Sequence, residues 1–162
     1  MFSAWRKAVP AVSIFHHASS PPSNKALNIL RSAISAPYPP TKTDAPPLEY
    51  NLEVIESPPT IDQLKTIMSY LPSKATSPSM AFLSAHPSSG SASDRPQTIE
   101  GIIELAGKNP QALRWPIVVN WNDGQVAIGT VDGVRDILET IRKRRDGELK
   151  EEEVEQPKGW FT

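Results

Sequence analysis

The sequence predicts an α/β fold built on a four-stranded mixed sheet, and two patterns lead to that prediction. Short apolar or alternating runs, typical of strands, are interspersed with longer runs in which apolar residues recur at helical spacing. Their order is a βαβ unit followed by a ββα unit. A βαβ unit pairs its strands in parallel, whereas a hairpin pairs them antiparallel, so we expect one mixed sheet covered by helices.

The first half of the chain is predicted to contain two strand–helix pairs. The first helix begins at Ser20, because serine caps free backbone N–H groups and the prolines that follow are tolerated in a first turn. Thr60 and Gln63 match a capping box, which predicts the start of the second helix. The predicted elements are strands 12–16 and 48–54 and helices 21–35 and 61–71, with a Pro-rich loop at 36–47.

The second half is predicted to supply the hairpin and two further helices. Asn122-Asp-Gly124 is a hairpin turn signal between two apolar runs. Gly107 is expected to end the helix before the hairpin, and Asp132 to cap the helix after it. The predicted elements are helix 98–105, a connection at 108–115 with room for one helical turn, strands 117–121 and 125–129, and a helix with Val134, Ile137, Leu138 and Ile141 on one face.

Composition divides the chain into a domain and less compact segments. Proline makes up 17 of 162 residues, about twice its usual share. Hydrophobic residues make up only 38%. Residues 72–97 hold eight Ser and four Pro, so we expect a long surface insertion there. The domain is predicted to span 12–145, with this insertion at 72–97, a basic segment at 1–11 and a charged flexible tail at 146–162.

The amino-terminal region has the composition of a mitochondrial import sequence. Residues 1–43 contain no Asp or Glu and carry five Lys or Arg, and the opening is MFSAWRKAVPA. Import sequences are basic, rich in Ser and Ala, and poor in acidic residues. We therefore expect a mitochondrial location, although an ordinary disordered terminus is equally compatible with these residues.

The absence of cysteine excludes more functions than any other feature. With no Cys in 162 residues, the chain has no disulfide, thiol nucleophile, C-x-x-C pair or Cys-ligated metal. It has only three His, so we do not expect a structural zinc site. No cofactor is predicted. A net charge of −1 gives no general attraction to nucleic acid, and no apolar run is long enough to predict a transmembrane segment.

Three segments resemble the arsenate reductase branch of the thioredoxin-like superfamily. The first is a strand leading into a polar loop at a helix start, the second carries Pro-Pro-Thr at a helix start, and the third is a Pro-Ile-Val-Val strand. The βαβ–ββα order is also that of thioredoxin-like folds. These segments are VSIFHHASSPPSNKALNIL, YNLEVIESPPTIDQLKTI and RWPIVVNWNDGQ.

Within that branch the chain resembles a fungal family of mitochondrial redox proteins. The Ser-rich insertion with His86-Pro87 and the Pro-Pro-Thr-x-Asp-Gln-Leu run both fit it. The resemblance covers roughly residues 11–72 and 98–140. It implies a thioredoxin-like fold and an oxidoreductase acting on a peptide, protein or small-molecule thiol.

The resemblance also places the site, and the residues there depart from the pattern. The nucleophilic cysteine of arsenate reductases falls at Ser20, at a helix start whose free N–H groups would stabilise an anion. Two oxyanion-binding arginines fall at Trp115 and Gly129. Arg114 is one position earlier, and on an extended chain it would point away from the site. Arsenate reduction is therefore not expected.

Pro116 matches the proline that is cis in thioredoxin-like folds, and we expect it to be cis beside the Ser20 loop. Trp115 would then contact that loop, with simple packing as the alternative.

Residues 86–95 are either a lid over the site or a solvated insertion, and the 142–145 basic cluster is expected to be a frayed helix end. The candidate binding residues are Ser19, Ser20, Ser23, Arg114, Trp115 and Pro116.

Two functions follow from these observations. The resemblance implies a mitochondrial oxidoreductase. The chemistry of a cysteine-free chain instead favours a non-catalytic module that binds a peptide, protein or small anion at the Ser20/Pro116 groove. A hydrolase is a third possibility, and it would require Ser20 or Ser23 to have a histidine beside it.

Overall fold

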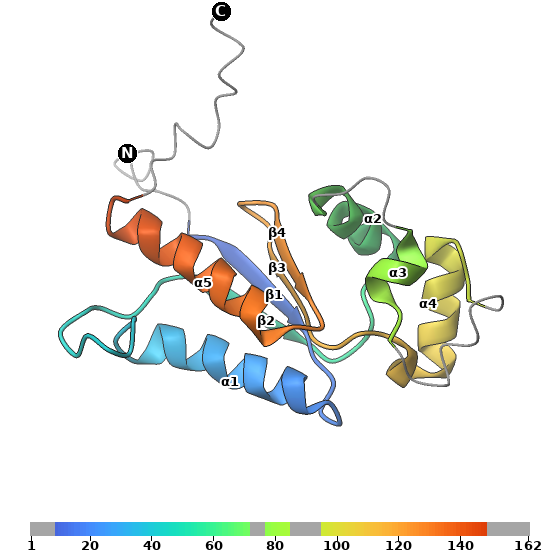
Figure 1. Cartoon of the computed structure of the whole chain (residues 1–162), viewed down its shortest axis with the longest axis horizontal. Coiled ribbons are helices and arrows are strands. Elements are labelled where there is room, and N and C mark those ends of the chain that lie inside the picture. Colours follow the sequence, from blue (N-terminus) through green and yellow to red (C-terminus); the bar gives the residue numbers. More distant parts are fainter. Residues whose placement is uncertain (1–8, 72–76, 85–94, 149–162) are drawn as a thin grey trace, which may run out of the picture.

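The computed structural model describes residues 9–71, 77–84 and 95–148. It contains the predicted α/β arrangement of strands and helices (Figure 1). In chain order the elements are β1 (Ala11–Phe15), α1 (Pro21–Ser35), β2 (Asn51–Ile55), α2 (Ile61–Tyr70), α3 (Pro78–Phe82), α4 (Ile99–Lys108), the 3-10 turn η3 (Pro110–Ala112), β3 (Ile117–Asn120), β4 (Gln125–Ile128) and α5 (Val131–Arg145).

The four strands form one mixed sheet in the order β2-β1-β3-β4. β1 pairs in parallel with β2 through Ala11↔Asn51 and the residues that follow. It pairs antiparallel with β3, and β3 pairs antiparallel with β4 across the predicted hairpin. β1 is therefore a central strand, and its carboxyl end leads directly into α1.

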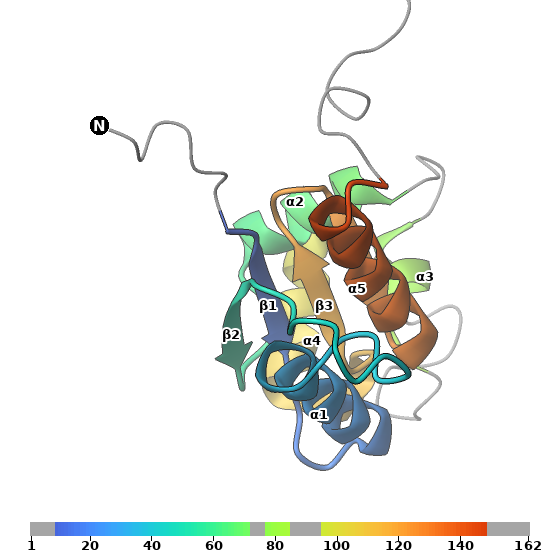
Figure 2. The same ribbon diagram turned by 90° about the vertical axis from the view of Figure 1, so that its left-hand side faces the viewer.

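Helices cover both faces of the sheet, as the turned view shows (Figure 2). On one face, Val12 and Ile14 pack with α1 and α5 in one buried cluster. On the other face, Phe15 and Ile117 pack with α2, α3 and α4 in a second cluster. Because side chains alternate across a strand, one short strand contributes to both cores.

Several predicted boundaries were wrong by a few residues, for identifiable reasons. The alternating pattern begins at Leu48, but β2 begins at Asn51, where its ladder with β1 starts at the pair Ala11↔Asn51. Leu48 and Tyr50 are buried nevertheless, since the Leu48 N–H donates to Ala33 O and the Tyr50 hydroxyl to Leu30 O. Their alternation reflects burial against α1 rather than strand pairing.

The two helices flanking the hairpin also differ from prediction. α4 runs past Gly107 to Lys108, with Asn109 as its C-cap. α5 is capped by Thr130 instead of Asp132, because the Thr130 hydroxyl accepts the Gly133 N–H and Asp132 lies within the first turn. The chain offers two residues that favour N-caps within three positions, and local pattern alone does not choose between them.

Part of the predicted surface insertion belongs to the core, so the prediction that all of 72–97 lies on the surface was wrong. α3 buries Ala81 and Phe82, and Leu83 after it is 0% exposed. Leu83 also forms an isolated antiparallel bridge with Leu113, and the Arg114 N–H donates to Phe82 O at 2.8 Å. The Ser- and Pro-rich composition concealed a short apolar anchor. The remainder of the insertion at 72–76 and 85–94, including His86, lies outside the described residues.

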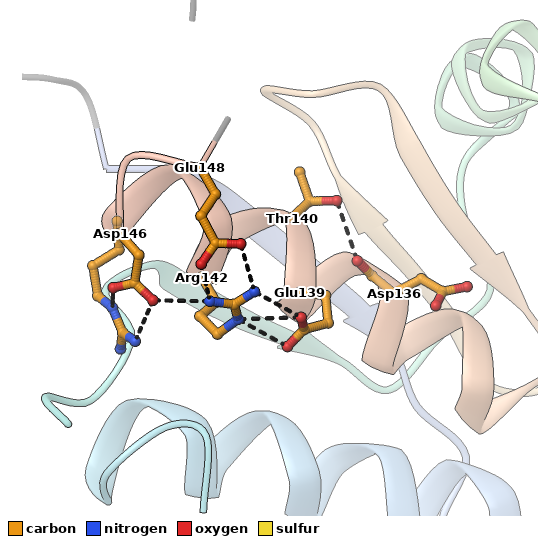
Figure 3. A network of polar contacts seen from close by, with 7 residues as sticks. Asp136, Glu139, Thr140, Arg142, Asp146 and Glu148 are labelled. Carbon is orange, nitrogen blue, oxygen red and sulfur yellow. Dashed lines mark hydrogen bonds and ion pairs between the residues drawn. The ribbon is translucent and has the colours of Figure 1, made fainter. Parts of the chain in front are cut away.

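The end of α5 is ordered, although a frayed end was predicted. Arg142 forms ion pairs with Glu139, Asp146 and Glu148 (Figure 3). The helix closes through Gly147, whose φ of 79° allows its N–H to donate to Arg144 O. The positive charge of Arg142 is therefore compensated by acidic side chains within residues 139–148. The predicted tail beyond 148, with Trp160-Phe161, lies outside the described residues.

Candidate functional site

The loop between β1 and α1 is held in place by the residues around Ser20. Ser20 is the N-cap of α1, and its hydroxyl accepts the Ser23 N–H at 3.4 Å. The Ser20 N–H donates to His17 O at 3.0 Å, and the Asn24 amide donates to Ala18 O at 3.0 Å. Ser20 therefore acts as the predicted helix cap.

The first turn of α1 offers no free backbone N–H group. Pro21 and Pro22 have no N–H to donate. The Ser23 N–H is taken by Ser20, and the Asn24 N–H donates to Ser20 O at 3.0 Å. We expected free amides that could hold an anion at this helix start, and that expectation was wrong because the two prolines remove them. The helix dipole remains, but the cradle of donors that binds oxyanions does not.

Ser23 and His16 form a buried pair that resembles a nucleophile and its base. Ser23 Oγ lies 2.6 Å from His16 Nδ1 and also accepts the His17 N–H at 3.1 Å. However, Ser23 is 0% exposed and His16 is 6% exposed. A substrate cannot reach a hydroxyl buried in this way. The pair ties the β1–α1 loop to the helix instead.

The connection that enters β3 faces this loop. The Trp115–Pro116 peptide bond is cis, as predicted. The Trp115 indole N–H donates to Pro110 O at 2.7 Å, and its ring centroid lies 5.2 Å from that of His17. Trp115 is 7% exposed. The predicted contact between Trp115 and the Ser20 loop is thus made through His17.

Arg114 lies on the same side as Trp115, which corrects the predicted opposite orientation. Strict alternation applies only to an extended strand, and β3 does not begin until Ile117. Arg114 Nε donates to Leu83 O at 2.8 Å. Its aliphatic carbons lie against Gly129, where a Cβ would be 3.2 Å from Arg114 Cβ.

These segments line an open pocket of about 620 Å³, which we call the Ser20 pocket. Ser19, Ser20, Arg114 and Trp115 line it, whereas the candidates Ser23 and Pro116 do not. Pro116 is buried, and its carbonyl accepts the Gly129 N–H at 2.7 Å. The lining residues are His17, Ser19, Ser20, Ser84, Gln111, Leu113, Arg114, Trp115 and Gly129.

Sequence reasoning did not select His17, Ser84, Gln111 or Leu113 as pocket residues. Ser84 comes from the insertion, and its hydroxyl donates to Gln111 O at 2.7 Å. The Ser84 N–H donates to Ala112 O, also at 2.7 Å. The apolar run that contains Leu83 was the one signal that could have placed Ser84 near the site.

The described part of the chain contains neither a metal cluster nor a membrane-spanning helix. Nowhere in 9–71, 77–84 or 95–148 do three or more His, Asp or Glu gather in a way that could hold a metal ion. None of the helices in those ranges combines the length and apolar composition needed to cross a bilayer.

Comparison with solved structures agrees with a thioredoxin-like fold. An arsenate reductase from Vibrio cholerae has 17% sequence identity and a TM-score of 0.50, covering 82% of this chain and 98% of its own. A protein from Yersinia pestis assigned to the arsenate reductases has 21% identity and a TM-score of 0.49, covering 79% of this chain and 98% of its own. At such identities the likeness shows the fold alone.

Sequence comparison identifies the family. No curated protein matches the chain. A family model described as "Protein of unknown function (DUF1687)" matches residues 2–129, which include the Ser20 loop, the insertion and the strands of the sheet. The chain therefore belongs to the DUF1687 family and has a thioredoxin-like fold of the arsenate reductase type.

Proposed function

We propose that this protein is a non-catalytic binding module that holds a peptide or small molecule in the Ser20 pocket. One observation carries the proposal. Ser20, which the resemblance to arsenate reductases aligns with their nucleophile, caps α1 and lines a pocket in a chain without any cysteine. Under that alignment, the residue at this place on the scaffold has no thiol to react.

The walls of the Ser20 pocket suit an organic ligand. A volume of about 620 Å³ is in the usual range for small-molecule sites. His17 and Trp115 provide an aromatic surface, and Ser19 and Ser20 provide hydroxyls. Neither the N–H nor the C=O of Trp115 is hydrogen-bonded within the part of the chain that the structure describes. Unpaired main-chain groups of this kind can pair with an extended peptide.

The reactions suggested by the resemblance lack their reactive groups in this chain. Thiol–disulfide exchange requires a thiolate, and none of the 162 residues is cysteine. A serine hydrolase requires a base on an accessible hydroxyl. The described histidines bond to Ser23 and Ser19 rather than to the Ser20 hydroxyl, and Ser23 is 0% exposed. A redox role would therefore need a thiol carried by the bound partner.

A titration with a filled-pocket variant tests the proposed function. Ser19 is exposed and lines the pocket, so Ser19→Trp fills it without removing a side-chain bond. Ser32→Trp, on the exposed face of α1, is the matched control. We expect glutathione or blocked tripeptides to shift the ¹⁵N-NMR signals of His17, Ser20 and Gly129 in the parent chain and in the control only. If no probe in this panel moves those signals, the pocket is not a binding site.

We also propose that the protein is mitochondrial. The support is the acid-free, basic composition of residues 1–43. Fusing those residues to a fluorescent reporter in a fungal cell should send the reporter to mitochondria. Replacing Arg6 and Lys7 by Glu should abolish that targeting. A reporter that stays in the cytosol with the parent segment would overturn the proposal.

A further inference from the structure

We infer that the ligand of the Ser20 pocket carries a carboxylate beside an apolar group, and that Arg114 binds the carboxylate. The inference deepens the proposed function and depends on it. It rests on three features: the state of the Arg114 guanidinium, the missing donors at α1, and the apolar surface beside the arginine.

The Arg114 guanidinium is positioned but only partly used. Nε is held by Leu83 O at 2.8 Å, and the aliphatic stem lies on Gly129. Within the described residues, neither Nη atom has a hydrogen bond or an acidic partner, although Arg114 is exposed and lines the pocket. No Asp or Glu is among the lining residues. Among the described residues, the pocket thus presents one positive charge without an acidic partner, on a side chain that is already fixed at one end.

The geometry of the donors favours a carboxylate over a tetrahedral oxyanion. Phosphate and arsenate are held by several donors, typically the free amides of a helix start. Pro21 and Pro22 remove those amides here, and Ser23 uses its own in the cap. The two Nη groups that remain can hold the two oxygens of a planar carboxylate through parallel charge-assisted bonds.

The apolar surface beside Arg114 defines the rest of the ligand. Leu113 and the Trp115 ring line the pocket on either side of Arg114 in the chain, and His17 lies against Trp115. An aromatic or aliphatic group next to the carboxylate would cover this surface. A peptide ending in an apolar residue and a small aromatic carboxylic acid share this chemistry, and the experiment distinguishes them.

Matched ligands test the carboxylate directly. N-acetyl-phenylalanine and its amide differ only in that group, so we expect the acid to bind the full chain at least about tenfold more tightly than the amide, by ¹⁵N-NMR titration. Charge-assisted bonds contribute about 1.5–3 kcal/mol, which corresponds to that factor or more. Arg114→Gln should weaken the acid to the affinity of the amide, and Arg114→Lys should weaken it partly. The charge-matched control Arg31→Gln, on the exposed face of α1, should leave both affinities unchanged.

Each outcome supports or overturns the inference, and its failure differs from failure of the proposed function. If the acid and the amide bind with equal affinity, the inference that the ligand carries a carboxylate is overturned, while the pocket remains a binding site. Inorganic phosphate binding as tightly as the acid would also overturn it, as would the absence of any shift with the acid. An unchanged amide affinity in Arg114→Gln shows that the variant keeps its pocket. A tetrapeptide ending in Phe that binds more tightly than the acetylated amino acid identifies a peptide source, and equal binding identifies a small acid.

Discussion

Gly129 lies directly against the side chain of Arg114 and adopts a φ of 74°. A Cβ at this position would be 3.2 Å from Arg114 Cβ and 3.6 Å from Arg114 Cδ. The resemblance to arsenate reductases placed an oxyanion-binding arginine at position 129. Here that position is glycine, and the space beside it is taken by an arginine from a different segment.

Gly129→Ala should destabilise the protein and displace Arg114. A left-handed backbone costs a residue with a Cβ about 1–2 kcal/mol, and the crowded Arg114 stem adds to this. Urea unfolding measures the change in free energy. Gly107→Ala is the control, because Gly107 lies in α4 with no atom within 4 Å of the place that an added methyl group would take, and it should gain up to about 1 kcal/mol. Equal effects at both sites would contradict the assigned geometry.

Ser23→Ala should destabilise the protein more than Ser20→Ala. Removing the Ser23 hydroxyl leaves His16 Nδ1 and the His17 N–H without their partner in a buried environment, which costs about 1–3 kcal/mol. Removing the Ser20 hydroxyl loses one long cap bond and costs about 1 kcal/mol. The comparison uses unfolding midpoints of the two variants. A neutral Ser23→Ala would mean that the buried pair does not hold the loop.

Phe82→Ala should be among the most destabilising single substitutions in the chain, at about 3–5 kcal/mol, because Phe82 is 0% exposed. Met80 lies in the same short helix but is 66% exposed, so Met80→Ala should change stability by less than about 0.5 kcal/mol. Thermal and urea unfolding of the two variants measure this contrast. If both substitutions have similar, small effects, α3 is part of a solvated insertion, as its composition suggested, and not part of the core.

Acid should weaken the closure of α5. The hydrogen bond from Arg142 lowers the pKa of Glu148, and that from Arg145 lowers the pKa of Asp146. A carboxyl whose pKa is lower in the folded state adds stability above its unfolded pKa, and this is lost as pH falls through the folded value. The loss should therefore appear below about pH 4.

Urea midpoints between pH 7 and pH 3, at low and high salt, measure this dependence. Both carboxyls are solvent-exposed, so salt should reduce the effect. Arg142→Gln should reduce the loss of stability between pH 7 and pH 3, while Arg31→Gln should leave that loss unchanged. An identical pH profile for the two variants would show that the Arg142 cluster in Figure 3 contributes nothing to stability.

The elements could be predicted where the signal is local. The Thr60–Gln63 capping box and the Ser20 cap are sequence patterns in which each partner lies within three residues of the other, and both are present. The hairpin follows from Asn122-Asp-Gly124 in the same way. The mixed sheet then follows from the order of elements, because βαβ and hairpin connections fix which strands run in parallel.

The site could be predicted only in part, because its lining comes from four separate stretches of chain. Ser20 and Trp115 were selected through a family resemblance, and the structure places both on the pocket. The orientation of Arg114 depends on irregular backbone before β3, where alternation does not apply. The approach of Ser84 depends on burial of Phe82 and Leu83, which a Ser- and Pro-rich composition conceals.

The most direct test of the claim that this scaffold carries out no thiol chemistry is an insulin-reduction assay driven by dithiothreitol. The assay uses the purified chain, verified by mass to contain no added cysteine. We expect a rate equal to that of dithiothreitol alone, in the parent protein and in Ser20→Ala alike. A rate above that background that grows with protein concentration and disappears in Ser20→Ala would contradict a purely binding role for the Ser20 pocket.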